Sequence, residues 1–282
     1  ARAPGGGAAV PGGRGGRARL LVLIFHRVLP RPDPMYASAP DRATFELYMR
    51  ALAEDFRVLP LGEALRRQRE GRLPAGSAVV TFDDGFADNV TEALPVLAKL
   101  GLPATFFIAT GYLGEGCMFN DAVIEACGRE PEGTWSTGTP EFGDVPAGGP
   151  GERPALAQRL IDGLKYADAG RRRACAAELL ASAGARPPPG LMMSEAQLRE
   201  LHAAGMEIGG HTRTHPILSR LDEAAAREDI RAGKADLEAI TGAPVELFAY
   251  PNGRPGTDFL ARDARLLARE VVGAAQERDA SA

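Results

Sequence analysis

Short apolar runs alternate with amphipathic segments along most of the chain. Residues 20–25 and 78–82 are continuous apolar runs of the kind found in strands that are buried on both faces. Shorter runs predict further strands at 104–108, 205–209 and 245–250. The segments between and beside them have helical periodicity, and we predict helices over 44–55, 61–69, 89–100, 194–204, 222–240 and 258–269.

Several of these helices carry recognisable end signals. Ser194 with Gln197 is a capping-box pattern, and Gly101 and Gly242 suit helix C-caps. Pro95 should interrupt the helix over 89–100. Strands that alternate with helices imply parallel strands joined by right-handed crossovers. The pattern therefore predicts an α/β fold: a (β/α) barrel fits best, and a doubly wound open sheet is the alternative that periodicity does not exclude.

Residues 114–190 depart from this alternation. Gly and Pro cluster at 130–154 and at 186–190, with helical patches at 155–164 and 171–180. We interpret the segment as an insertion with a loose loop and two or three helices, carried on a main domain that spans 20–282. It could shape a substrate groove or cover the sheet, and we favour covering. Residues 1–19, rich in Gly, Ala, Arg and Pro, are predicted to form a disordered arm.

Composition and charge exclude several classes of protein. Hydrophobic residues make up 45% of the chain, the net charge is −4 and the pI is about 5.7, which argues against a general affinity for nucleic acid. Three scattered cysteines indicate no disulfide framework. No apolar run approaches the ~20 residues of a membrane span, and no signal peptide is visible. A cytoplasmic location is therefore slightly favoured, although the chain starts at Ala1 and its N-terminus could be incomplete; the oligomeric state stays open.

Two adjacent carboxylates follow the strand at 78–82, in the sequence Thr81-Phe-Asp-Asp-Gly85. Neighbouring carboxylates repel each other unless a cation or a proton separates their roles. Gly85 allows a tight exit from the strand and a close approach of the backbone. Alone, such a sequence is more often a simple turn.

Two of the four histidines of the chain lie four residues apart, in His211-Thr-Arg-Thr-His215. We expect both imidazoles on one face of a helical turn, a spacing that suits a single metal ion. Joined with Asp84, they form an open three-ligand set for Zn²⁺ or a similar cation, which leaves one position for water and leaves Asp83 free to act as a base. Both motifs follow predicted strands and can converge at one end of a barrel, so together they predict a metal hydrolase.

In this order and separation, the two motifs resemble the first two signature motifs of the polysaccharide deacetylase family, the NodB-homology carbohydrate esterases of family 4. The resemblance covers about residues 20–269. It implies a distorted (β/α) barrel, one divalent metal (most simply Zn²⁺, with Co²⁺, Ni²⁺ or Fe²⁺ as alternatives) and removal of acetyl groups from glycans. By position, it implies Asp83 as the general base and Asp84, His211 and His215 as the metal ligands.

The third motif of the family departs from its usual form. It is commonly Arg-x-Pro followed by Tyr or Phe, whereas the matching stretch here is Ala249-Tyr-Pro-Asn-Gly253. Ala249 thus replaces the arginine that would orient the base. We assign Tyr250, Pro251 and Asn252 to substrate or oxyanion binding, with a backbone N–H near Asn252 as the oxyanion donor. A core position would suit Tyr250 equally well.

The general acid also differs from the usual form of the family. The family supplies a histidine late in the chain as the acid, whereas here no histidine follows His215. The barrel could therefore lack its last strand or strands. His26, which follows the strand at 20–25, matches a first-strand histidine that serves as the acid in a subset similar to the poly-N-acetylglucosamine deacetylases. Histidine titrates near neutrality, which suits donation to an amine. The structural alternative is a histidine that only caps the strand end.

These features favour a metal-dependent hydrolase that removes acetyl groups from N-acetylated sugars or polysaccharide, and so acts on carbon–nitrogen bonds of linear amides. The expected partner is an N-acetylated glycan or amino sugar. One alternative is an amidase for a small non-sugar amide, since aromatic residues make up only 6% of the chain and a polymer groove would use them for stacking. Another is a barrel that binds glycan without turnover, which the loss of the arginine favours and the retention of Asp83 opposes.

Overall fold

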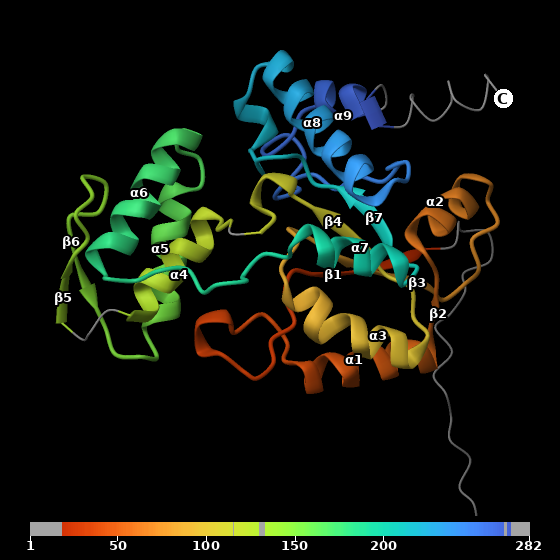
Figure 1. Ribbon diagram of the computed structural model, residues 1–282, viewed down its shortest axis with the longest axis horizontal. Helices are drawn as coiled ribbons and strands as arrows, with labels where there is room; N and C mark the ends of the chain where they lie inside the picture. Colours follow the sequence, from red (N-terminus) through yellow and green to blue (C-terminus); the bar gives the residue numbers. More distant parts are fainter. Residues whose placement is uncertain (1–18, 115, 130–132, 268–269, 272–282) are drawn as a thin grey trace, which may run out of the picture.

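A parallel sheet occupies the centre of the molecule (Figure 1). The computed structural model describes residues 19–114, 116–129, 133–267 and 270–271. The strands β1 (Leu20–Phe25), β3 (Ser77–Phe82), β4 (Thr105–Ile108) and β7 (Glu207–Gly210) are hydrogen-bonded in that order, and the short β2 (Arg57–Val58) also pairs with β3. Every pairing in this sheet is parallel, which confirms the α/β class predicted from the alternation.

The helices form where the periodicity predicts them. In sequence order they are α1 (Arg42–Asp55), α2 (Leu61–Arg69), α3 (Leu94–Leu100), α7 (Glu195–Ala203), α8 (Glu223–Thr241) and α9 (Ala261–Leu267). The capping box between Ser194 and Gln197 is present in both directions, and Gly242 ends α8 in the left-handed conformation. The helix over 89–100 is divided as expected: a π-helical turn, Asn89–Ala93, precedes α3 beside Pro95, which has no N–H to continue the regular ladder.

The main core lies between the sheet and the helices α1, α3, α7 and α8. All six residues of β3 are buried, and Phe82 stacks on Phe106 of β4 with ring centroids 4.7 Å apart. The expectation that β1 is buried on both faces is wrong. Leu21, Val22 and Ile24 are 41%, 45% and 61% exposed, because β1 pairs only with β3 among the described strands and is an edge of the sheet.

The strand predicted at 245–250 is reduced to a single parallel bridge between Gly210 and Phe248. Gly210 donates to the carbonyl of Leu247 at 2.8 Å and accepts from the N–H of Ala249 at 3.0 Å, after which the chain turns away at Pro251. The arm predicted for residues 1–19 falls, apart from Arg19, outside the described residues. Residues 272–282 also lie outside the described residues. The expectation that the barrel lacks its last strand or strands depends on them and stays a prediction.

The segment 114–190 packs around a cluster of its own. It contains α4 (Phe119–Arg129), α5 (Arg153–Leu164), α6 (Ala169–Ser182) and an antiparallel hairpin of β5 (Gly133–Ser136) and β6 (Asp144–Ala147), joined by buried side chains such as Trp135 and Leu179. The hairpin was not predicted, since Gly133 and Pro146 disguise it as a loop. The segment lies beside the sheet rather than over it, so the expectation that it covers the sheet is wrong (Figure 1).

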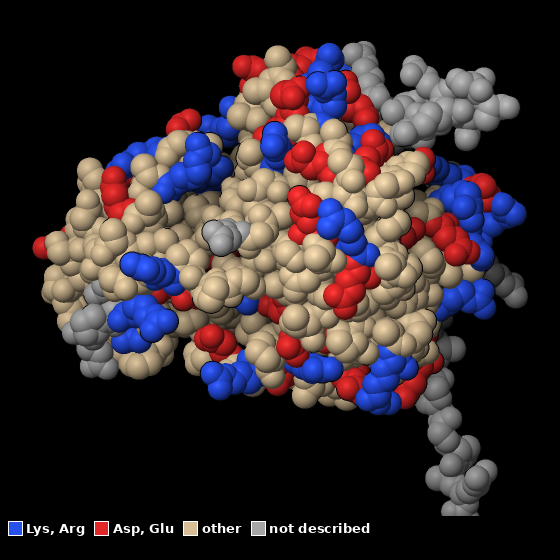
Figure 2. All heavy atoms as spheres, viewed as in Figure 1, with Lys and Arg blue, Asp and Glu red and all other residues tan. Residues whose placement is uncertain are grey.

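Acidic and basic side chains are interspersed on the face shown in Figure 2. Within the described residues, none of the helices combines the length and the apolar character that crossing a membrane requires.

Candidate active site

The end of β3 places the two adjacent carboxylates. Asp83 continues the sheet ladder by donating its backbone N–H to the carbonyl of Phe25 at 2.9 Å. The chain then turns sharply through Asp84 (φ 77°) and Gly85 (φ 99°), both in the left-handed region. A side chain at Gly85 would come 3.1 Å from Ile108 of β4, so the turn needs glycine both for its backbone angle and for its close approach. This turn carries the Asp84 side chain away from the ladder and buries it.

The two histidines of the second motif also lie close together, with ring centroids 4.9 Å apart, but not on a helical turn. Residues 211–215 form a loop in which Thr212 (φ 64°) and His215 (φ 52°) are left-handed. The Thr212 hydroxyl donates to the carbonyl of His211 and accepts from the N–H of His215 at 3.1 Å. These two hydrogen bonds offset the strain of a β-branched residue at positive φ. The prediction from the spacing that the two rings lie close together is confirmed. The prediction that residues 211–215 form a helical turn is wrong.

Two residues of α8 contact this loop and hold it in place. Asp229 of α8 accepts the backbone N–H groups of Arg213 and Thr214 at 2.7 and 2.9 Å, and the Thr214 hydroxyl at 2.6 Å. Gly233, one turn later, touches the loop so closely that a Cβ there would lie 2.6 Å from the backbone of Thr212. Sequence reasoning did not find either residue, because neither belongs to a motif.

Asp84, His211 and His215 converge as predicted. The Oδ1 atom of Asp84 lies 3.5 Å from Nε2 of His211 and 3.3 Å from Nε2 of His215, and the three ligand atoms lie within 4.8 Å of one another. Oδ1 is buried without a hydrogen-bond partner among the described residues, which is costly unless a cation satisfies it. This donor set and its unsatisfied oxygen fit a divalent metal of the Zn²⁺ type.

Electrostatics favour the metal-binding forms of Asp84 and His215, whereas the pKa of His211 is raised, because Asp84 and Asp83 outweigh the lowering effect of burial. Burial acts to raise the pKa of Asp84, but His215 and His211 hold that pKa well below its usual range. Burial lowers the pKa of His215 to about 4, which keeps its imidazole neutral at neutral pH. The carboxylate is therefore ionised and the His215 ring unprotonated, as metal coordination requires.

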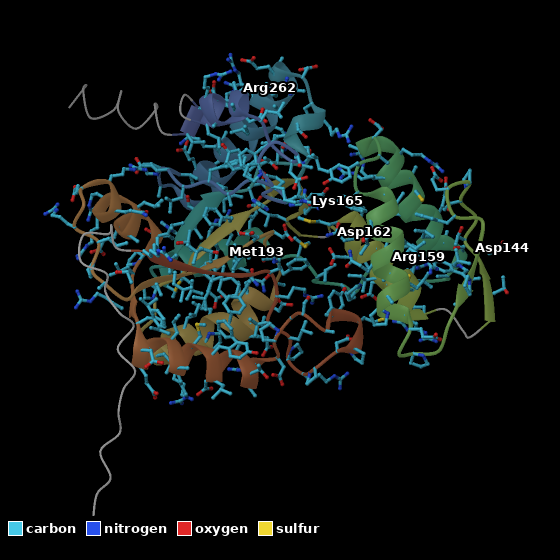
Figure 3. All side chains as sticks on the ribbon, turned by 180° about the vertical axis from the view of Figure 1, so that it is seen from behind. Asp144, Arg159, Asp162, Lys165, Met193 and Arg262 are labelled. Carbon is cyan, nitrogen blue, oxygen red and sulfur yellow. The ribbon has the colours of Figure 1, made fainter. Side chains whose placement is uncertain are left out.

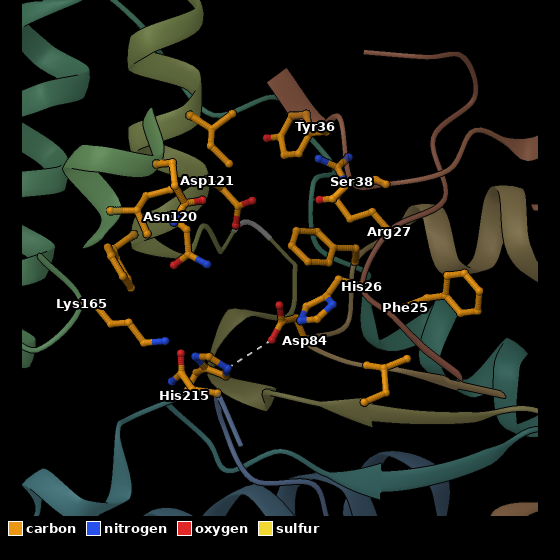
Figure 4. Close-up of a pocket in the computed structure, with 18 of the residues that line it drawn as sticks. Phe25, His26, Arg27, Tyr36, Ser38, Asp84, Asn120, Asp121, Lys165 and His215 are labelled. Atoms are coloured by element: carbon orange, nitrogen blue, oxygen red, sulfur yellow. Dashed lines mark ion pairs between the residues drawn. The ribbon is translucent and has the colours of Figure 1, made fainter. Parts of the chain in front are cut away.

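Asp83 and His26 both lie beside the three ligands. Burial raises the pKa of Asp83, while His211 and His26 act to lower it. His26 is exposed at the end of β1, lines the same pocket as Asp84, and accepts the Asn89 side-chain amide on its backbone carbonyl at 2.9 Å. Figure 4 shows its ring next to the Asp84 carboxylate. Of the two residues predicted as base and acid, His26 therefore lines the pocket, whereas Asp83 is close enough to interact electrostatically with it but is not among the lining residues.

The third-motif residues are only partly brought to this place. Asn252 (φ 64°) lines the pocket. Pro251 is buried and is not among the lining residues. Tyr250 stacks on Phe259 with ring centroids 3.8 Å apart and belongs to an apolar cluster with Leu266, so its ring packs in the core instead of facing the pocket.

The pocket itself has a volume of about 540 Å³ and two walls of different origin. His26, Asp84, His215 and Asn252 come from loops at the ends of the strands. The opposite wall comes from the inserted segment, and its polar members on α4, on α5 and at the C-cap of α5 are Asn120, Asp121, Gln158, Asp162 and Lys165. Figure 3, seen from behind, shows Asp162 and Lys165 on the side of α5 that faces the sheet. The pocket thus favours the alternative that the inserted segment shapes a groove, although no motif pointed to these residues.

Comparisons with known proteins identify the family and the fold. The polysaccharide deacetylase family pattern matches residues 70–271. A poly-beta-1,6-N-acetyl-D-glucosamine N-deacetylase of Staphylococcus aureus is 33% identical over 103 residues, which are 36% of this chain and 35% of that protein. The aligned part of the chain thus spans about a third of the length of that relative.

Solved structures resemble the fold. The deacetylase PplD of Streptococcus pyogenes, determined in complex with acetate, has a TM-score of 0.57 at 17% identity, over 91% of this chain and 82% of that one. IcaB from Ammonifex degensii has a TM-score of 0.52 at 23% identity, over 90% and 81%. The fold is therefore the distorted barrel type of the NodB-homology deacetylases, and the chain belongs to the polysaccharide deacetylase family.

Proposed function

We propose that this protein is a metal-dependent deacetylase that removes acetyl groups from N-acetylated sugars or polysaccharide. The observation that carries the proposal is the meeting of Asp84, His211 and His215 beside Asp83 and His26, in a chain of this family. Three of these residues, His26, Asp84 and His215, line one pocket. The named substrate of the Staphylococcus aureus relative supports an N-acetylglucosamine polymer as the substrate class.

Asp84, His211 and His215 would hold the metal. A divalent cation bound there would lower the pKa of a water molecule and polarise the acetyl carbonyl. Zn²⁺ suits the Asp-His-His set best, and Co²⁺, Ni²⁺ and Fe²⁺ are the alternatives.

The remaining residues divide the proton transfers. Asp83 accepts the proton of the water molecule whose oxygen attacks the acetyl carbon, and its raised pKa makes it a stronger base than an ordinary aspartate. As the C–N bond breaks, His26 donates a proton to the leaving nitrogen, so acetate and a free amine are released. A backbone N–H near Asn252 stabilises the negative charge on the carbonyl oxygen. Tyr250 has no part in this scheme, because its ring packs against Phe259.

The polar wall of α4 and α5 favours a sugar over a small non-sugar amide, because a hydroxyl-bearing ring needs such hydrogen-bonding groups. The arrangement of Asp83 and His26 disfavours a barrel that only binds glycan, since binding alone has no use for a base and an acid beside the metal ligands.

The test combines metal content with acetate release, using adjacent substitutions as mutual controls. Protein purified without chelator should contain close to one equivalent of metal and release acetate from a β-1,6-linked N-acetylglucosamine trimer. Asp84→Asn should lose the metal and the activity. Asp83→Asn should keep the metal, and its kcat should fall by about 10²- to 10⁴-fold. If the parent contains no metal, even after incubation with Zn²⁺, or if the Asp83→Asn protein retains full activity, the proposal is wrong.

A further inference from the structure

Asp121 is a buried carboxyl group that the proposed reaction does not use. It lies in the first turn of α4, on the inserted wall of the pocket, and is 3% exposed. Its Oδ2 atom has no hydrogen-bond partner among the described residues, and the backbone of Met118 offers the one hydrogen bond that the carboxyl group receives there. Figure 4 shows the carboxyl group pointing into the pocket toward the Asp84 side. A buried polar atom without a partner costs free energy, so its presence needs a reason.

Other buried aspartates show what a structural role looks like in this protein. Asp88 accepts hydrogen bonds from the Arg27 guanidinium at 2.7 Å and from the Val28 backbone at 3.3 Å. Asp258 accepts the Tyr166 hydroxyl at 3.0 Å and the Arg254 backbone N–H at 3.1 Å. Both tie together segments that are distant in sequence or close a turn. Among the residues that the structure describes, Asp121 joins no two segments in this way, so holding the fold does not explain it.

The surroundings of Asp121 do not neutralise it either. The cation that lowers the pKa of Asp121 is Arg27, which is engaged by Asp88 and lies over the rings of Tyr36 and Phe86 at 4.5 and 5.0 Å. Asp84 and Glu125 add negative charge nearby. Burial first, and then Asp84, raise the pKa of Asp121 to about 7. A carboxyl group with this pKa is present at neutral pH in both forms, so it can accept a hydrogen bond from a hydroxyl group or donate one to it.

Asp121 faces the candidate active site from the opposite wall of the pocket. It shares the pocket with His26, Asp84 and His215, whose loops lie across from α4. A sugar whose acetamido group reaches the metal ligands would present its ring hydroxyl groups to the inserted wall.

We infer that Asp121 is a substrate-binding residue whose carboxyl group hydrogen-bonds a ring hydroxyl of the amino sugar held at the metal ligands. This inference rests on the proposed deacetylase function and goes beyond it, because it assigns the recognition of the sugar to the inserted segment.

The experiment compares two acetyl donors with the metal-loaded full chain. One is the N-acetylglucosamine trimer, and the other is 4-nitrophenyl acetate, which has no hydroxyl groups for Asp121 to bind. Asp121→Ala should lower kcat/KM for the trimer by about 10- to 100-fold and leave the ester reaction within about twofold of the parent. Asp121→Asn, which retains a donor and an acceptor, should recover part of the loss. Asp144→Asn, an exposed position on β6, should change neither rate.

A parallel fall for both donors would overturn the inference, because it would show that Asp121 acts on the metal site or on the fold. Inhibition of the ester reaction by the trimer supplies a readout that does not need deacetylation. If the parent cleaves only the ester, the proposed function fails. Trimer inhibition that is weaker in Asp121→Ala would then still support sugar binding by Asp121, and equal or absent inhibition would refute it.

Discussion

The Nδ1 atom of His211 lies 2.9 Å from the carbonyl oxygen of Ala249. An N–H donated there fixes the ring so that Nε2 faces Asp84. The main chain at position 249 therefore orients a metal ligand whatever side chain the residue carries, which is a different role from that of the arginine expected there to orient the base.

Ala249→Ser should therefore keep metal affinity within about threefold of the parent. Loss of a partner that orients a ligand typically costs 10- to 100-fold in affinity, but this substitution leaves the carbonyl in place. Competition with a coloured chelator measures the affinity directly. A tenfold or larger loss would mean that the side chain at 249 matters and that the main-chain explanation is wrong.

Gly233→Ala should displace the loop 211–215, which carries the two histidines and packs against α8. The new Cβ would lie 2.6 Å from the backbone of Thr212, so α8 or the loop must shift. We expect about 1–3 kcal/mol of destabilisation and at least a tenfold loss of metal affinity. Gly151→Ala, where a Cβ meets nothing within 4 Å, is the matched control and should behave as the parent. Normal metal titration of the Gly233 variant would contradict the prediction.

Asp229→Ala should weaken the site without touching a ligand. It removes three hydrogen bonds that hold Arg213 and Thr214 in place between the two histidines. We expect roughly a tenfold loss of metal affinity and about 1–3 kcal/mol of stability. Glu228→Ala, an exposed acid on the same helix, should leave both quantities unchanged. Equal metal affinity and equal stability in the two variants would show that the loop keeps its conformation without Asp229.

Asp121→Asn should stabilise the protein in a pH-dependent way. Burial raises the pKa of Asp121 from its ordinary value of 3.8 to about 7, so the folded state holds this proton more tightly than the unfolded state does. The parent therefore loses stability as the pH rises from about 4 to about 7, and the variant avoids that loss. Denaturant unfolding at pH 5 and at pH 8 should give a larger gain for the variant at pH 8. A gain that does not change with pH would show that the carboxyl group titrates normally.

Sequence patterns predicted the parts of the fold that depend on local signals. The ends of α7 and α8 follow from Ser194, Gln197 and Gly242, and the buried β3 follows from its apolar run. The hairpin β5–β6 was missed because Pro146 is tolerated where β6 has only one neighbour among the described strands. The exposure of β1 could not be foreseen either, since an apolar run does not say which of its sides will be covered.

The candidate site divides in the same way. Asp84, His211 and His215 were found because their spacing is a pattern, although their placement as catalytic machinery remains a proposal. Asp121, Asp229 and Gly233 were missed, because each matters only through contacts with residues that are distant in sequence. The division into an arm and a barrel remains a prediction, and the favoured cytoplasmic location finds no support in the comparisons.

Left-handed backbone angles outside glycine gather at the site. In the described part of the chain, the residues concerned are Asp84, Thr212, His215 and Asn252. Each position stores strain that the surrounding contacts must hold in place. The loops that carry the ligands are therefore expected to open locally before the sheet unfolds. On gradual heating, activity would then decline while the helical and strand content is still intact.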